Sequence, residues 1–135
     1  MVLDTNVLVA AFRSSLGASY KLLQTLESRV WRPVISPALA FEYEAVLKRG
    51  ASETDLTLRD IDDFVEYLCS RSRLVQIYFH WRPALRDPND NRILEVAVRT
   101  GSPVVTFNTR DFAGAERFGV KVMGPKELLP LVWRP

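Results

Sequence analysis

Short apolar runs of strand type alternate along this chain with longer stretches of helical periodicity. The strand-type runs are residues 2–3, 31–35, 104–106 and 120–123, and residues 74–78 form either a further short strand or an extended segment. The helical stretches are residues 7–12, 19–27, 37–49, 58–70, 87–100 and 125–131. Such alternation favours an α/β fold with a parallel sheet covered by helices on both faces. Nothing in the 135 residues divides them, so we expect one domain spanning residues 1–135.

Two helix starts are marked by capping residues. Ser36 is a good N-cap and is followed by Pro37, a residue that fits the first helical position. Thr57 with Asp60 three residues later matches a capping box. We therefore expect helices to begin directly after Ser36 and Thr57.

Composition narrows the class of protein. The apolar fraction of 47% and the charged fraction of 25% are typical of a globular protein. No apolar run approaches the roughly 20 residues that span a bilayer, and the first residues lack the pattern of a secretory signal. Cys69 is the single cysteine, and we expect it to be a packing residue. A chain that cannot form an internal disulfide is typical of the reducing cytoplasm. We therefore expect a cytoplasmic protein that has no membrane segment. A net charge of +2 neither requires nor excludes a nucleic-acid partner.

Two carboxylates, those of Asp4 and Glu42, occupy positions that suggest a function beyond stabilising the fold. Asp4 directly follows a buried strand, and ligands bind at the carboxyl ends of strands in open α/β sheets. Its alternative role is that of a helix N-cap. Glu42 lies in the middle of the apolar stripe of its helix, where a lone charge is costly unless it is paired or binds a metal. The alternatives for Glu42 are a position at the edge of the stripe and an ion pair with a basic residue.

Two further acids complete the pattern. Asp90 heads a helix on the face that its apolar residues turn towards the core, and it can act both as an acidic first-turn residue and as a metal ligand. Asp111 follows the strand that ends at Thr106, although a surface turn also explains it. Carboxylate oxygens suit Mg²⁺ and Mn²⁺. One histidine, His80, and Cys69 are too few for a zinc site, and the chain has neither a glycine-rich phosphate loop nor a Ser-His-Asp arrangement.

Four ordered motifs give the chain a resemblance to the PIN domain family, close to the toxin components of toxin–antitoxin systems. The motifs are residues 2–9, 36–47, 86–97 and 105–112, and residues 122–129 also match. The resemblance implies a three-layer sandwich of helices around a mainly parallel sheet, and a divalent-metal-dependent ribonuclease. The family's metal-binding acids correspond to Asp4, Glu42 and Asp90. Many relatives carry an aspartate at the position of Asn108, so either Asp111 replaces that acid or the second metal site is weak.

The resemblance also suggests supporting roles for residues near the acids. Thr5, Asn6, Thr106 and Asn108 are expected to orient carboxylates or water. Arg86, Arg92 and Arg110 flank the motifs and are candidates for contacts with RNA phosphates. Glu95 is expected on a more polar face of its helix, as a supporting residue.

Partners and alternative activities follow from the same reasoning. A toxin would be neutralised by a small antitoxin protein, and apolar groups such as Trp81, Leu131 and Trp133 could serve a homodimer. The alternative activities are a DNA nuclease, possibly structure-specific in its substrates, and an RNA-binding module that has lost catalysis. A small-molecule phosphatase is disfavoured because the segment from Asp4 to Asn6 lacks a second acid two residues on.

Overall fold

The computed structural model describes residues 1–14, 16–77 and 87–133. Within these residues, no helix has the length and apolar character needed to cross a membrane. The predicted loop from His80 to Arg86 lies outside the described residues.

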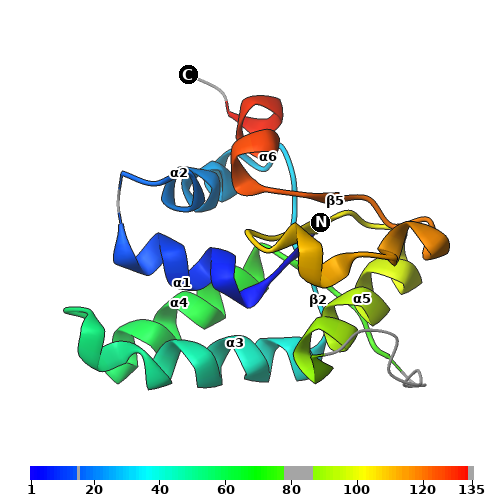
Figure 1. Cartoon of the computed structure of the whole chain (residues 1–135). Coiled ribbons are helices and arrows are strands. Elements are labelled where there is room, and N and C mark those ends of the chain that lie inside the picture. The colour runs from blue at the N-terminus through cyan, green and yellow to red at the C-terminus, as the bar shows by residue number, and fades with distance from the viewer. Residues whose placement is uncertain (15, 78–86, 134–135) are drawn as a thin grey trace.

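Short parallel strands form the centre of the molecule (Figure 1). The sheet has the order β1–β4–β5, made by Val2–Leu3, Val104–Val105 and Val122–Met123, and Leu3 pairs with Val105 in register. A second parallel pair, β2 (Val34–Ile35) with β3 (Arg73–Leu74), continues beyond β1. The backbone N–H of Val34 donates to Met1 O at 2.8 Å and so links the two groups of strands. The predicted α/β fold with a parallel sheet is confirmed.

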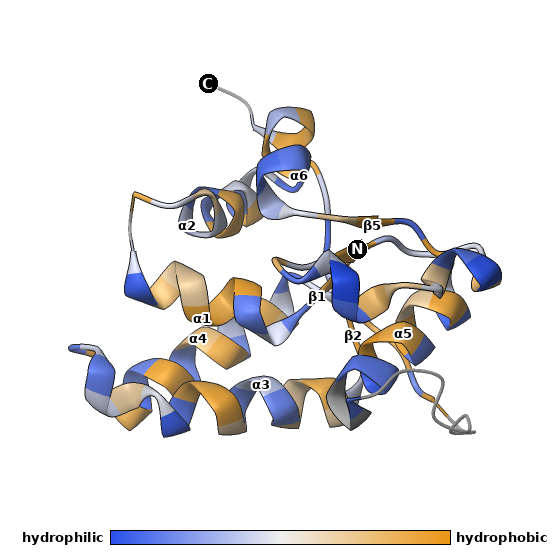
Figure 2. Cartoon of the chain, in the orientation of Figure 1, coloured by the Kyte–Doolittle hydropathy of each residue, from blue (hydrophilic) through white to orange (hydrophobic). Residues whose placement is uncertain are grey.

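Helices follow most of the strands. The helices are α1 (Thr5–Arg13), α2 (Ala18–Gln24), α3 (Pro37–Arg49), α4 (Leu58–Ser70), α5 (Pro88–Thr100) and α6 (Pro125–Val132). Short 3-10 turns are η1 (Thr25–Ser28), η2 (Ala51–Glu53), η3 (Thr109–Phe112) and η4 (Ala115–Phe118). Figure 2 shows polar and apolar bands alternating along α3, as expected of a helix with one face in the core.

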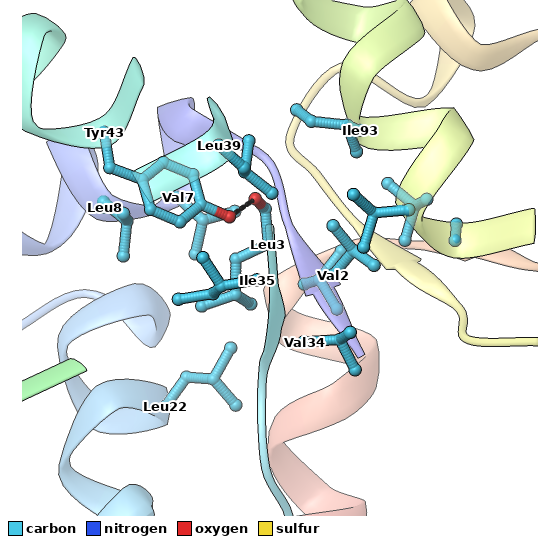
Figure 3. Packing of buried hydrophobic residues seen from close by; sticks show 14 of the residues in the cluster. Val2, Leu3, Val7, Leu8, Leu22, Val34, Ile35, Leu39, Tyr43 and Ile93 are labelled. Carbon is cyan, nitrogen blue, oxygen red and sulfur yellow. Dashed lines mark hydrogen bonds between the residues drawn. The ribbon is translucent and has the colours of Figure 1, made fainter. Parts of the chain in front are cut away.

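Both faces of the sheet are covered, because successive strand residues point to opposite sides. Val2 lies on the side of Ile93 from α5, whereas Leu3 lies on the side of Leu8 and Leu22 from α1 and α2 (Figure 3). All of these side chains are fully buried or nearly so. The result is the layered arrangement of helix, sheet and helix that the sequence predicts.

Most predicted boundaries are close to the observed ones. The Ser36 hydroxyl accepts a hydrogen bond from the N–H of Leu39, and Thr57 and Asp60 form the capping box. The strand predicted for residues 31–35 is too long, because only Val34–Ile35 pair with a neighbour. The strand predicted for residues 120–123 is likewise restricted to Val122–Met123. Helix α1 begins at Thr5, earlier than the predicted start at residue 7.

Candidate functional site

Two polar residues meet at the carboxyl edge of the central sheet. Asp4 directly follows β1 and Thr106 directly follows β4, so the parallel register places them side by side. The N–H of Asp4 donates to Val105 O at 2.8 Å, which fixes the backbone at this point. The Thr106 hydroxyl donates to Asp4 Oδ2 at 2.6 Å, and both side chains are buried. The sheet itself therefore holds the Asp4 carboxyl in place.

The Thr106 hydroxyl is the centre of a small hydrogen-bond network. It accepts from Asn6 Nδ2 at 3.3 Å and from the backbone N–H of Asn108 at 3.0 Å. Because two donors already point at its oxygen, its own proton is directed to Asp4. Asn6 Oδ1 in turn accepts from the N–H of Phe107 at 3.3 Å. Thr5, the remaining residue of this predicted set, is buried at the start of α1.

Asp90 lies in the first turn of α5 with only 9% of its surface exposed. Burial, followed by the carboxylates of Asp4, Asp87 and Asp111 in that order, raises the pKa of Asp90 to about 7. The pKa of Asp4 is also raised by burial, against the lowering effect of the Thr106 hydrogen bond, and Asp111 adds to the increase. These acids come from separate stretches of chain and act on one another. They form an acidic edge, the name used below for Asp4, Asp87, Asp90 and Asp111.

Asp111 and Asn108 occupy different places in this arrangement. Asp111 lies in η3 and is exposed, yet its charge acts on both Asp4 and Asp90. Asn108 contributes its backbone N–H to Thr106, and its side chain is exposed. Asp111, and not Asn108, therefore contributes the negative charge of η3 to the acidic edge.

Sequence reasoning missed Asp87. It assigned this residue only to the start of a helix, and Asp87 O does accept from the backbone N–H and the side chain of Asn91. The carboxylate of Asp87 nevertheless acts on Asp90. The spacing of three residues between Asp87 and Asp90 could have revealed this interaction, because residues three apart in a helix lie on the same face of that helix.

Glu42 lies on α3 and contacts α5 through Arg92. Its Oε1 is buried and has no hydrogen-bond partner among the described residues, while Oε2 lies 3.5 Å from Nη1 of Arg92. The Glu42 side chain is 13% exposed and the Arg92 side chain is 47% exposed. Arg92, predicted to contact RNA phosphate, is therefore positioned beside a carboxylate. Oε1 of Glu42 therefore remains without a hydrogen bond from any described residue.

The other predicted positions are distributed around this region. Arg110 is exposed in η3, and Arg86 lies outside the described residues. The polar face predicted for Glu95 is wrong, since Glu95 is only 7% exposed. Its side of α5 borders a pocket of about 320 Å³ that Phe41, Ile77 and Arg92 also line. Of the apolar residues predicted for a dimer, Leu131 is 64% and Trp133 43% exposed, and Trp81 lies outside the described residues.

The donor set fits a hard divalent cation in its chemistry. Every candidate ligand is a carboxylate, the preferred ligand of Mg²⁺ and Mn²⁺. The unpaired Oε1 of Glu42 and the raised pKa of Asp90 both indicate a place where a positive charge would be stabilised. Across the described residues, no three His, Cys, Asp or Glu side chains are already close enough together to hold a metal. Like charges with no cation between them repel, so the carboxylates would have to turn inwards to bind one.

Comparison with known proteins gives one family. Residues 1–110 match the family model described as the PIN domain, which covers the chain from β1 through β4 and the start of η3. Asp4, Glu42 and Asp90 lie within the match, and Asp111 is the first residue after it. No curated protein matches the chain.

Proposed function

The chain belongs to the PIN domain family, and from this premise we propose that it is a divalent-metal-dependent ribonuclease. Membership of the family suggests a nuclease, and family nucleases generally use a divalent metal. The proposal adds that RNA is the substrate, that Mg²⁺ or Mn²⁺ is the cofactor, and that Asp4, Glu42, Asp90 and Asp111 are the metal ligands. It also locates the protein in the cytoplasm, as expected from its single cysteine.

One observation carries the proposal: two buried acids from separate parts of the chain, Asp4 and Asp90, have raised pKa values at the carboxyl edge of the sheet. Burial and three neighbouring carboxylates raise the pKa of Asp90 to about 7. A fold selected for stability alone would avoid burying two carboxylates beside further like charges. A requirement for a bound cation explains why the acids are there.

The residues around the acids can each be given a task. A bound divalent cation would supply Lewis acidity towards a phosphodiester. Thr106 orients the Asp4 carboxylate through its hydroxyl, and Asn6 holds that hydroxyl in position. Such support fixes the donor oxygens before substrate arrives, which lowers the cost of ordering them.

Substrate phosphates would approach between exposed basic groups. Arg110 is adjacent to Asp111 and is exposed, so it is free to meet a phosphate at the acidic edge. Arg92 lies beside Glu42, and a cation on Glu42 would release its guanidinium for the RNA backbone. The pocket that Phe41 and Arg92 line adjoins Glu42 in sequence and in space, and it offers room for part of a nucleotide.

The test is a cleavage assay on single-stranded RNA and on DNA of the same sequence, with Mg²⁺, Mn²⁺ or chelator. We expect the wild type to cut RNA only with metal, and Asp4→Asn to cut at least about 100-fold more slowly. Asp63→Asn is the matched control, because Asp63 is an exposed acid on α4. Equal cutting by Asp4→Asn and wild type would overturn the metal site, and cutting of DNA alone would overturn the choice of substrate.

A second candidate is an RNA-binding module with weak or no catalysis. The observation that favours it is the contact between Glu42 and Arg92, which partly neutralises a proposed ligand. RNA binding that persists in Asp4→Asn, with no cutting by the wild type in Mn²⁺, would select this function over the nuclease.

We also propose that the protein is the toxin of a toxin–antitoxin pair and forms a homodimer. Expression in a bacterial host should then arrest growth, and Asp4→Asn should abolish the arrest. Light scattering of the purified chain should give a dimer, which Leu131→Ser with Trp133→Ser would weaken because these are exposed apolar side chains at the C-terminus. Normal growth with an active enzyme would overturn the toxin role, and a monomeric wild type would overturn the dimer.

A further inference from the structure

A second hollow lies at the opposite end of the strands from the acidic edge. It measures about 400 Å³ and is formed where η1 leads into β2 and where α4 ends. Its lining includes Leu26, Arg29, Trp31, Arg32, Arg71 and Ser72. Arg32 precedes β2 by two residues, and its carbonyl accepts from the N-terminal amine at 3.1 Å. The strands of a parallel sheet run from this end to the acidic edge, so the two sites are separate. We call this hollow the arginine pocket.

Three arginines, Arg29, Arg32 and Arg71, line the arginine pocket. Within the described part of the chain, Arg29, Arg32 and Arg71 make no ion pair, and no carboxylate lines the pocket. Among the described residues, the Arg71 guanidinium also lies over the ring of Tyr67, 5.5 Å away. Three like charges around one hollow repel, and an anion between them would remove that cost.

The backbone at Arg29 gives an independent reason to suspect a ligand. Arg29 has a φ of 58°, the only positive φ of a non-glycine residue in the described ranges. A residue with a Cβ is strained in this left-handed conformation, and glycine is not. Strained positions of this kind occur where the side chain is needed for function. Here the position is the C-cap of η1, and its residue lines the pocket.

The floor of the arginine pocket is rigid. Trp31 is 7% exposed, and its indole N–H donates to the Thr25 hydroxyl at 2.7 Å. That hydroxyl donates to Leu22 O at 2.6 Å, so the indole is tied to the end of α2. A fixed floor beside the exposed Arg29 and Arg32 is a suitable frame for a small anion, because the floor need not be ordered on binding.

We propose that the arginine pocket binds a phosphate group. The planar fork of a guanidinium pairs with phosphate oxygens in a bidentate manner, and three of them suit a doubly charged group. The phosphate can belong to an RNA strand or be free in solution, since the recognised chemistry is the same. This site does not depend on the proposed nuclease activity, because it shares no residue with the acidic edge.

The experiment is an NMR titration of the full chain in chelator, which prevents any RNA cleavage. Inorganic phosphate is added in one series and a short single-stranded RNA in another. We expect saturable shifts of the Trp31 indole signal and of the backbone amides of Arg29, Arg32 and Ser72. Saturation by phosphate alone assigns the site to a free anion, saturation by RNA assigns it to a strand, and both results support the proposal. No shift of these signals up to about 10 mM of either probe would overturn it.

Variants separate binding from structure. Arg71→Met keeps an unbranched side chain against Tyr67 but removes the charge, and we expect about fivefold weaker binding. Arg59→Met, at the other end of α4, is the matched control and should bind as the wild type does. Arg29→Gly relieves the strained backbone, so it should unfold at the same or a higher temperature and still bind about fivefold more weakly. Equal weakening by Arg59→Met, or undiminished binding by both pocket variants, would contradict the assignment.

Discussion

Helix α3 carries two glutamates, two residues apart, that the fold treats in opposite ways. Glu44 accepts an ion pair from Lys48 at 2.8 Å, and Lys48 also reaches Asp62 of α4 at 2.7 Å. Among the described residues, Glu42 has a buried oxygen with no hydrogen-bond partner and a single 3.5 Å contact, with Arg92. Lys48 thus pairs with the acids of the α3–α4 surface, whereas one oxygen of Glu42 is buried without such a partner among the described residues, and at the acidic edge neighbouring carboxylates raise the pKa of Asp90. We infer that the surface acids are neutralised by lysine and by water, whereas Glu42 and the acidic edge require a bound metal ion for the same purpose.

The strongest test of the difference between Glu42 and Glu44 is to neutralise each glutamate in turn. Glu42→Gln should slow RNA cleavage by at least about 100-fold, because a neutral amide is a poor ligand for a hard cation. Glu44→Gln on the same helix should leave the rate unchanged. Gel assays with Mn²⁺ measure both variants, and circular dichroism confirms that both fold. Similar rates for the two variants would remove Glu42 from the site.

Thr106 tests whether the edge depends on its hydrogen-bond network. Thr106→Val keeps the shape of the side chain but removes the donor to Asp4, at a fully buried position. We expect the free energy of unfolding to fall by about 1.5–3 kcal/mol, the usual value of a hydrogen bond to a charged group. Urea denaturation measures this loss, and Thr109→Val in η3, an exposed threonine, provides the control. A loss no greater than that of Thr109→Val would show that Asp4 needs no such support.

The pH dependence of stability offers a more gradual test. Burial and neighbouring carboxylates raise the pKa of Asp90 to about 7, far above its value in the unfolded chain, so the folded state binds the proton more tightly. The contribution of Asp90 therefore makes the metal-free protein less stable as pH rises from about 4 to about 7. Asp90→Asn should remove this part of the slope, and Asp63→Asn should keep it. Thermal unfolding in chelator at several pH values measures the effect, and identical slopes in wild type and Asp90→Asn would contradict the coupling.

The smallest effect is expected at a surface ion pair. Arg13 and Glu53 approach to 2.7 Å, but their side chains are 60% and 63% exposed. Glu53→Gln should change the free energy of unfolding by less than about 1 kcal/mol and should not alter cleavage, because water screens such pairs. A loss of activity here would show that the site extends over the α1–η2 surface.

The sequence predicted the order of strands and helices and the position of Asp4 beside Thr106 at the sheet edge. Alternating periodicities required parallel strands, and parallel strands place Asp4 beside Thr106. Local chemistry also located the helix starts after Ser36 and Thr57, because a capping hydroxyl and the backbone N–H that donates to it lie within four residues.

Contacts between distant helices were beyond prediction. Periodicity defines a face of α3 and a face of α5, but not the angle and register at which the two meet. That geometry decides that Arg92 lies beside Glu42, and that one face of α5 buries Glu95. The hydrogen bond from the Tyr43 hydroxyl to Leu3 O also depends on how α3 packs against β1. Such pairs depend on packing between segments about 40 to 50 residues apart.

The most direct test of the account is the effect of Mn²⁺ on the stability of the chain. If the acids of the edge bind a cation, the unfolding temperature should rise with Mn²⁺ and saturate, with a gain of about 2.7 kcal/mol at 100 times the dissociation constant. Asp4→Asn should respond far less than Asp63→Asn, which should behave as the wild type does. An unfolding temperature that is independent of Mn²⁺ in the wild type, or an equal rise in Asp4→Asn, would contradict the claim that these carboxylates form a metal site.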